Sequence, residues 1–325
     1  MPVAVSGSIA SDHLMHFPGR FAEQVLPEQI HRLSLSFLVD DLQVRRGGIG
    51  ANIAFGMGVL GCNPVLVGAA GKDFDDYRSW LERHGVDCRG VHISETAQTA
   101  RFVCTTDEDM SQIASFYAGA MAESRQIEIK PIVDQVGELD LVMISPDDPD
   151  AMIRHAQECR QRGYTFAVDP SQQLARMNGE QVREFLVGAK YLFSNDYEWE
   201  LLLKKTGWTE AEVLDKVGMR ITTLGEKGAE IIDRKGPVVH VTAVPELAKA
   251  DPTGVGDAFR AGFLAGLSHG LDLERAAQLG SYIAVLVLET MGPQEWTFDA
   301  AEAVTRISGA FGPEAAQDIA AILPS

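Results

Sequence analysis

Two acids enclose a glycine-rich turn in Asp251-Pro252-Thr253-Gly254-Val255-Gly256-Asp257, and the spacing of apolar residues after it predicts an amphipathic helix over residues 258–269. Pro252 disfavours an earlier helix start, and the glycines permit backbone angles that a Cβ would forbid. The amides of residues 254–257 are therefore predicted to point outward together. Unpaired amides at the positive end of a helix dipole attract phosphate, so we call residues 251–257 the anion turn.

Asp257 is unusual in such a turn. A carboxylate is a poor phosphate ligand, but it accepts a proton well if a substrate hydroxyl lies beside the same phosphate. One short segment would then both stabilise developing charge and deprotonate a nucleophile. The alternative is that Asp257 only caps the helix and that the glycines make an ordinary tight turn. The two acids and the special backbone positions together favour the catalytic interpretation.

The composition is that of a large globular chain. Its 325 residues, 46% of them hydrophobic and 23% charged, can bury a large core and form one large domain plus a smaller one. A formal charge of −18 and a pI near 4.8 oppose binding to nucleic acid or to an anionic membrane. The start of the chain enters a strand without a basic segment, and no apolar run reaches transmembrane length, so we expect a cytoplasmic protein. The four cysteines are widely spaced and are expected to be reduced.

Strand-like and helix-like segments alternate along most of the chain. Strands are predicted over residues 3–9, 65–70, 139–145, 164–169 and 191–195, helices over 150–162 and 179–188, and a hairpin over 229–234 and 237–243. This rhythm is typical of βαβ units and predicts a parallel sheet covered on both faces.

Polar groups recur where these strands end. They are Gly7-Ser8-Ile9-Ala10-Ser11-Asp12, Asp169-Pro170-Ser171-Gln172-Gln173, Asn195-Asp196-Tyr197-Glu198 and Thr222-Thr223-Leu224-Gly225-Glu226-Lys227-Gly228. Taken singly, each is explained as well by loop and cap chemistry as by ligand binding. A row of them along one sheet edge is hard to explain by packing, and ligands of open α/β sheets bind at that edge.

Three segments do not fit the parallel sheet and predict a small β-lid. Residues 31–46 alternate between two faces, and residues 99–106 and 111–118 form a pair joined by an acidic turn. The aromatic side chains of Phe102 and Phe116 would either form the lid's own core or expel water from a polar cleft beneath it.

Glycines also lead into an earlier helix, in Gly47-Gly48-Ile49-Gly50-Ala51-Asn52, and suggest close contact with a ligand. Within that helix, Gly56-Met57-Gly58-Val59-Leu60-Gly61 spells GxGxxG, the fingerprint of dinucleotide-dependent oxidoreductases. No strand directly precedes it, so helix packing explains these glycines better. The sequence contains no GxxxxGK[ST] P-loop.

Four motifs, in their order along the chain, resemble those of ribokinase-family carbohydrate and nucleoside kinases. They are Gly47-Gly48 with Asn52, Asn195-x-x-Glu198, Thr223-x-Gly225-x-x-Gly228 and Asp251-x-Thr253-Gly254-x-Gly256-Asp257. Within that family the chain resembles bacterial adenosine kinases nearly end to end. Sugar kinases usually carry a different small residue at the position of Pro252, which weakens a sugar-kinase interpretation.

The resemblance implies a ribokinase-like three-layer α/β/α sandwich with a mostly parallel central sheet and a small β-sheet lid. Residues 1–12, 47–98 and 121–325 would form the large nucleotide-binding domain, and residues 13–46 and 99–120 the lid. It also implies Mg²⁺-dependent transfer of the ATP γ-phosphoryl group to the 5′-hydroxyl of adenosine, giving AMP and ADP in purine salvage. An exposed lid edge, and lid pairing known among relatives, lead us to expect a homodimer.

The same resemblance assigns roles to residues. Asp257 matches the catalytic base, and the amides of Gly254, Val255 and Gly256 match the anion hole. Nucleoside-site positions are Ser8, Asp12, Gly48 and Asn52 around the ribose, and Ser36, Phe102, Phe116, Gln172 and Gln173 around the base. ATP-site positions are Asn195, Thr223, Gly225, Gly228 and Gly256. Glu198 matches an acid that acts on magnesium and phosphate through water.

Two other functions remain open. Another kinase of the family could phosphorylate a different nucleoside or a sugar, and a non-catalytic nucleoside sensor could share the fold. A sensor would not need Asp257 beside the anion turn, and ATP consumption with adenosine would separate the two. The aromatic side chains and the two glutamine amides favour a purine nucleoside over a free sugar.

Overall fold

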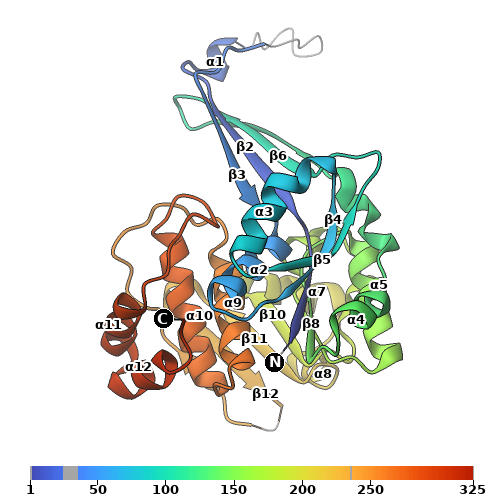
Figure 1. Ribbon diagram of the computed structural model, residues 1–325, viewed down its shortest axis with the longest axis vertical. Helices are drawn as coiled ribbons and strands as arrows, with labels where there is room; N and C mark the ends of the chain where they lie inside the picture. Colours follow the sequence, from blue (N-terminus) through green and yellow to red (C-terminus); the bar gives the residue numbers. More distant parts are fainter. Residues whose placement is uncertain (1, 25–35, 235, 325) are drawn as a thin grey trace.

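A mostly parallel sheet forms the centre of the computed structural model, which describes residues 2–24, 36–234 and 236–324 (Figure 1). Within these residues the sheet has nine strands, in the spatial order β13 (Val239–Val241), β12 (Ala229–Asp233), β11 (Met219–Thr223), β10 (Tyr191–Asn195), β9 (Phe166–Val168), β8 (Leu141–Ile144), β1 (Val3–Ser6), β4 (Val65–Ala70) and β5 (Asp87–Ile93). Only β12 and β13 run antiparallel to their neighbours. The predicted βαβ strands and the predicted hairpin all lie in this sheet.

Helices cover both faces of the sheet because its strands are apolar on both sides. Val3 and Val5 of β1 contribute to one core, whereas Ala4 between them contributes to the other. The first core is closed by α2 (Ile49–Val59), α3 (Asp75–Arg83), α9 (Val255–Ser268), α10 (Leu273–Leu288), α11 (Ala300–Phe311) and α12 (Pro313–Ala320). The second is closed by α4 (Ile129–Val136), α5 (Pro149–Arg162), α6 (Gly179–Leu186), α7 (Asp196–Thr206) and α8 (Glu210–Leu214). In the described part of the chain, every helix is too short or too polar to span a bilayer.

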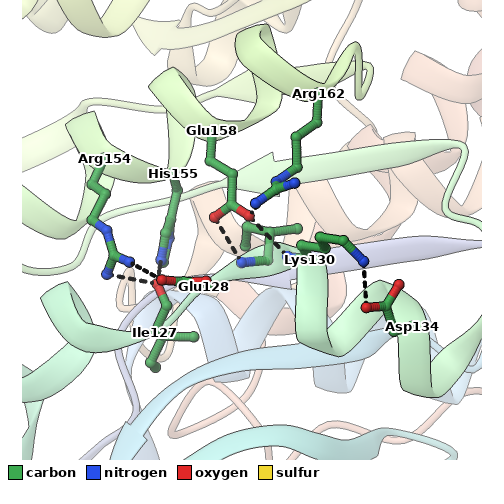
Figure 2. Close-up of polar contacts among 9 residues, drawn as sticks. Ile127, Glu128, Lys130, Asp134, Arg154, His155, Glu158 and Arg162 are labelled. Carbon is green, nitrogen blue, oxygen red and sulfur yellow. Dashed lines mark hydrogen bonds and ion pairs between the residues drawn. The ribbon is translucent and has the colours of Figure 1, made fainter.

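Buried polar contacts fix the second helical layer against the sheet. Figure 2 shows the carboxylate of Glu158 on α5 accepting hydrogen bonds from the amides of Ile129 and Lys130, at 2.8 and 2.9 Å. Glu158 thereby caps the N-terminus of α4, which has no cap of its own. His155, one turn earlier on α5, lies 2.8 Å from the Ser6 hydroxyl and 3.1 Å from the Ile127 carbonyl. Its Nε2 must donate to that carbonyl, so Nδ1 accepts from Ser6 at the end of β1.

A second, smaller sheet projects from one end of the body and carries α1 (Phe21–Gln24) near its tip (Figure 1). Its strand order is β3 (Asp41–Gly47), β2 (Ala10–His16), β6 (Ala100–Thr106) and β7 (Gln112–Tyr117). The predicted lid pair corresponds to β6 and β7, which are antiparallel with Phe102 opposite Phe116. We call this sheet the lid.

Three predicted elements differ from the structure. The first strand ends at Ser6, and Asp12 lies inside β2, a lid strand that the sequence did not predict. The strand predicted over residues 31–46 is described only from residue 36 and is a strand only from Asp41; its first five residues lie outside the described residues. Helix α9 starts at Val255, three residues before its prediction, because the helix begins within the anion turn itself.

Candidate active site

Two hollows share the N-terminal turn of α9 at the carboxyl edge of the large sheet. The first hollow, of about 480 Å³, is lined by Thr253, Gly254 and Asp257 from this turn and otherwise by the lid, α2 and the ends of β1 and β9. The second hollow, of about 570 Å³, is lined by Pro252, Val255 and Gly256, together with the ends of β10 and β11, the segment after β13, and α10. The anion turn therefore belongs to both hollows.

The backbone of the anion turn has the predicted geometry at a helix N-terminus. Gly254 precedes α9 with φ 80°, and a Cβ at this position would lie 2.5 Å from Cβ of Pro293. The amide of Ala258 makes the first helical hydrogen bond, to the Gly254 carbonyl at 2.8 Å, so the amides before it have no acceptor within the helix. Among the amides of residues 254–257, that of Val255 has one long contact, 3.4 Å, to the Pro252 carbonyl.

Asp257 lies at the first hollow with its carboxylate hydrogen-bonded to Asn52, whose Nδ2 donates to Oδ2 at 2.9 Å. Burial raises the pKa of Asp257 to about 7, although the hydrogen bond from Asn52 and the positive charge of Arg260 act in the opposite direction. Asp169 and Glu198 raise it further by repulsion. A carboxyl group with this pKa can accept a proton near neutral pH.

Arg260, one helical turn after Asp257, ties α9 to the sheet and was not predicted to contribute. Its side chain is buried, forms an ion pair with Asp169 after β9, and donates from Nη2 to Oδ1 of that residue at 3.0 Å. Its Nη1 also donates to the Gly256 carbonyl at 2.9 Å. Sequence reasoning missed Arg260 because it lies in an amphipathic helix and belongs to no motif.

Most residues predicted to hold the nucleoside line the first hollow. They are Ser8, Asp12, Gly48, Asn52, Phe116, Gln172, Gln173 and Asp257. Two predicted residues are not brought to it: Ser36 is exposed in the segment before β3, and Phe102 does not line the hollow. Phe102 nevertheless pairs with both Asp12 and Phe116 across the lid, so its side chain shares their face of the sheet.

One wall of the first hollow forms where the segment after β1 lies close to the start of α2. The Ser8 hydroxyl accepts from the Ile49 amide at 3.0 Å and so caps α2. Gly48 has φ 92°, and a Cβ there would lie 2.6 Å from the Ser8 carbonyl. Asp12 faces this region from the lid, where burial and repulsion by Asp251 raise its pKa to about 6 despite the nearby Arg45. At position 48, the positive φ and the short distance from a Cβ to the Ser8 carbonyl together require glycine.

The two glutamines that line the first hollow differ in their hydrogen bonds. The Gln172 carbonyl oxygen accepts from the Ser171 hydroxyl at 2.8 Å. The Gln173 Oε1 is buried and has no hydrogen-bond partner among the described residues, although a buried acceptor normally has one. Gln173 lines the hollow, but this oxygen atom is itself buried and does not open onto it. The sequence did not predict the neighbouring lining residues Met121 and Arg176.

Every residue predicted for the ATP site lines the second hollow: Asn195, Thr223, Gly225, Gly228 and Gly256. Asn195 and Thr223 are opposite each other at the ends of β10 and β11, because the parallel register aligns them. Gly228 has φ 93°, and a Cβ there would collide with the Val241 carbonyl, because the end of β13 lies directly against this turn.

Glu198 has a structural role that its motif also encodes. Its Oε2 accepts from the Asn195 amide at 2.8 Å, while Asn195 Oδ1 accepts from the Glu198 amide at 2.7 Å, which makes a capping box for α7. Its Oε1 lies 3.1 Å from the Ser171 hydroxyl, whose single proton it shares with Gln172. The described residues contain no group of three potential metal-binding side chains. Each carboxylate oxygen retains a lone pair for a water molecule, so Glu198 fits a magnesium ion held mainly by phosphate and water.

The lid is linked to the anion turn by an ion pair that no motif predicted. Arg45 on β3 lies with Nη1 3.5 Å from Oδ2 of Asp251, and both side chains are largely buried. The same Asp251 accepts from the amides of Thr253, at 2.9 Å, and Gly292, at 3.2 Å. Asp251 thus shapes the anion turn and contacts the lid.

Comparison with known proteins places this architecture in a family. The pfkB family of carbohydrate kinases matches residues 21–299. The chain belongs to this family. The nucleoside kinase of Burkholderia thailandensis in complex with inosine has a TM-score of 0.81 and 35% identity, over 95% of this chain and 98% of that one. Its ligand-free form has a TM-score of 0.85 and 36% identity, over 94% and 99%. The nucleoside kinase of Methanothermobacter thermautotrophicus is 28% identical over 312 residues, which is 95% of this chain and 96% of that protein.

These similarities confirm the predicted ribokinase-like α/β fold, with a large mostly parallel sheet, helices on both sides and a small second sheet. The predicted membership of the carbohydrate and nucleoside kinase family is confirmed as well. Both of these relatives are named for nucleosides as a class. The choice of adenosine therefore remains a prediction.

Proposed function

We propose that this pfkB-family protein is an adenosine kinase, which transfers the γ-phosphoryl group of ATP to the 5′-hydroxyl of adenosine and releases AMP and ADP. The observation that carries the proposal is the anion turn between two hollows, with Asp257 lining the first and Gly256 the second. A nucleoside in the first hollow and ATP in the second would meet at this turn. The kinship with nucleoside kinases, one of them bound to inosine, supports the same arrangement.

In the proposed reaction Asp257 is the general base. It would accept the proton of the 5′-hydroxyl as the hydroxyl oxygen bonds to the γ-phosphorus and the bond from that phosphorus to the ADP oxygen breaks. The outward amides of the anion turn would stabilise the negative charge on the transferred group. Asp12 and Asn52 would hold the ribose, since both line the first hollow with polar groups.

Mg²⁺ bound with ATP would neutralise phosphate charge in this reaction. In this chain, Glu198 would contact it through water. Glu198 repels Asp257, and a cation beside Glu198 would offset part of this negative charge. The capping box holds Glu198 in place whether or not a cation is present.

A purine fits the part of the first hollow lined by Phe116, Gln172 and Gln173 better than a free sugar would. Phe116 supplies an aromatic face from the lid, and stacking on a base contributes on the order of 1–3 kcal/mol. Gln173 lines the same hollow, and a glutamine amide can both donate to and accept from the edge of adenine. Inosine offers a carbonyl oxygen in place of the exocyclic amino group of adenosine. Because an amide can present its NH₂ group to a carbonyl as well, the assay below decides between the two nucleosides.

The substrate is tested by a coupled assay of ADP release across adenosine, inosine, guanosine, cytidine, ribose and fructose. We expect the highest kcat/KM with adenosine and a value at least about a hundredfold lower with free ribose, because ribose cannot reach Gln173 or Phe116. Efficient use of inosine and poor use of adenosine would assign a different nucleoside kinase. Phosphorylation of ribose or fructose as efficiently as adenosine would contradict a nucleoside kinase altogether, and binding of adenosine without ATP consumption would indicate a sensor.

We also infer that two copies of this chain pair through their lids. Side chains alternate between the two faces of a strand, so Leu42, Val44 and Ile113 lie on the face opposite to Asp12 and Phe116. These three apolar side chains are 47–58% exposed. A second copy of the same face would cover them, and C2 pairing is the commonest way to do so.

A further inference from the structure

A buried chain of hydrogen bonds runs from Asp257 to the backbone of residue 47 through two side chains with no role so far, Tyr77 and Gln294. Asn52 Nδ2 donates to Asp257 at 2.9 Å, and Gln294 Nε2 donates to Asn52 Oδ1 at 2.9 Å. The same Nε2 donates to the Tyr77 hydroxyl at 2.6 Å, and that hydroxyl donates to the Gly47 carbonyl at 2.9 Å. Tyr77, Gln294 and Asn52 are 7%, 1% and 8% exposed.

The direction of every hydrogen bond in this series follows from the last one, between Tyr77 and the Gly47 carbonyl. A carbonyl can only accept, so Tyr77 must donate its single proton to Gly47 and can only accept from Gln294. Gln294 must therefore present its NH₂ group, whose two protons go to Tyr77 and to Asn52. Asn52 can then offer only its own NH₂ group to Asp257. This orientation suits an ionised Asp257, whereas a flipped Asn52 would place a second acceptor against the carboxylate.

A buried glutamine at position 294 would destabilise the folded protein if its side chain only filled space. Its Oε1 is buried and has no hydrogen-bond partner among the described residues. An unsatisfied buried acceptor opposes folding, and a side chain of similar size without polar atoms would avoid that cost. The NH₂ group, by contrast, makes both of its hydrogen bonds. What Gln294 contributes is therefore the fixed orientation of Asn52.

We propose that Tyr77 and Gln294 are positioning residues, which hold the NH₂ group of Asn52 toward Asp257 and so keep this carboxylate ready to accept the proton of the substrate. The proposal rests on the role of Asp257 in the proposed function. Gln294 follows α10 in the turn that also packs Pro293 against Gly254, so one turn supports both the amides and the base. Loss of either side chain would leave Asn52 free to rotate and would make ionised Asp257 less stable.

Other charged groups also act on Asp257 and remain unchanged in the variants below. Arg260 on its own helix favours the ionised form, whereas Asp169 after β9 and Glu198 on α7 oppose it. Asp12 faces the same hollow from the lid. A change in the titration of Asp257 after substitution of Gln294 or Tyr77 would therefore report on the hydrogen-bonded chain.

The test compares Gln294→Met and Tyr77→Phe with wild type, with Gln278→Met as the control. Gln278 is also a buried glutamine, 5% exposed, but it bonds to Glu274 and Arg275 on α10. In Gln294→Met we expect the acid limb of the kcat profile to move up by about one pH unit, with kcat about fivefold lower at pH 7 and close to that of wild type at pH 9. Tyr77→Phe should shift the limb in the same direction by less, and Gln278→Met should leave it in place.

An unchanged acid limb in folded Gln294→Met and Tyr77→Phe, with a lower melting temperature only, would overturn the proposal. If Gln294→Met does not fold, Tyr77→Phe, which removes one oxygen, decides alone. The ¹³C NMR titration of the Asp257 carboxyl, identified by its loss in Asp257→Asn, gives a second readout that needs no activity. An inactive wild type with a shifted Asp257 titration would reject the proposed function and retain the positioning role.

Discussion

Asp257 differs from most carboxyl groups in having a pKa near 7, because burial outweighs the hydrogen bond from Asn52 and the charge of Arg260. In ordinary solution an aspartate is ionised far below neutral pH and is a weak base. A pKa near the working pH combines a large ionised fraction with a useful proton affinity. The raised pKa of Asp257 thus comes from its surroundings and not from the turn sequence alone.

The acid limb of kcat/KM for the nucleoside, measured at saturating ATP, is expected near pH 7. Because the folded pKa is raised, Asp257 loses its ionised form as the pH falls through 7, and kcat/KM should drop about tenfold between pH 8 and pH 6. The residual activity of Asp257→Asn is the control and should lack this limb. A limb of the same position in that variant would assign the titration to another group, such as ATP.

Phe116 is expected to contribute more to nucleoside binding than Phe102. Phe116→Ala should raise the KM for adenosine at least about tenfold and leave the KM for ATP nearly unchanged, since the lost surface lies in the first hollow. Phe102→Ala is the matched comparison, because Phe102 is its cross-strand partner but does not line that hollow. Equal effects on adenosine and ATP in Phe116→Ala would place the nucleoside elsewhere.

Single residues could be predicted where they belong to a contiguous motif. They could not be predicted where their contacts join distant parts of the sequence. Asp257, Gly48 and the five residues predicted for the ATP site lie at the two hollows, because short motifs place them at strand ends and helix starts. Gln294 meets Asn52 across 242 positions in sequence, and Arg45 meets Asp251 across 206. No local pattern carries such pairings, because they depend on how separate elements pack. Ser36 was placed by resemblance alone, and the structure leaves it exposed.

At the scale of elements, the N-terminus of α9 is positioned from three sides. Arg260 holds the Gly256 carbonyl, Asp251 accepts from Thr253, and Pro293 packs on Gly254. The backbone therefore keeps its amides directed outward before any phosphate binds. Such preorganisation lowers the reorganisation needed during phosphoryl transfer.

Gly254→Ala is expected to reduce the free energy of unfolding by about 1–3 kcal/mol, because alanine is strained at φ 80° and its Cβ would collide with Pro293. The same change should lower kcat by displacing the amides. Gly309→Ala is the control: this helical glycine has no atom near its missing Cβ, and alanine there should stabilise α11 by about 0.5–1 kcal/mol. Chemical denaturation measures both, and a Gly254→Ala variant as stable and active as wild type would contradict the strained turn.

The elements with clear periodicity were the predictable ones. β4 and β10 match their predicted bounds, and α5 differs by one residue, because apolar runs and capping signals define them. β2 was missed because its sequence, Ala-Ser-Asp-His-Leu-Met-His, has neither β-branched residues nor clean alternation. It forms because β3 and β6 pair with it on both sides, which is tertiary information.

At the scale of the whole molecule, the lid projects from the body on the strands β2, β3 and β6 (Figure 1). Its residues Asp12 and Phe116 line the first hollow. One face carries Asp12 and Phe116 toward the hollow, and the other carries exposed apolar side chains. The two faces suit two partners, the nucleoside and a second copy of the chain. The overall agreement with a ligand-free nucleoside kinase, at a TM-score of 0.85, extends over 94% of this chain.

We expect sedimentation at micromolar concentration to give a dimer mass. Val44→Lys and Ile113→Lys place charges on the exposed apolar face and should each shift the mass toward that of a monomer, because an unpaired charge would be buried in the pairing. A lysine at exposed Val304 on α11, distant from the lid in sequence, serves as the control and should leave the dimer intact. A monomer mass for the wild type would contradict lid pairing.

The central claim is that phosphoryl transfer occurs at the anion turn between the two hollows, with Asp257 as the base. The most direct measurement follows [γ-³²P]ATP with adenosine and Mg²⁺ in a single turnover, using wild type and Asp257→Asn. We predict label in the 5′-phosphate of AMP, one ADP per AMP, and a rate about 10²–10⁴-fold lower in the variant, with adenosine affinity kept within about threefold. ATP hydrolysis without labelled AMP, or a variant as fast as wild type, would contradict the claim.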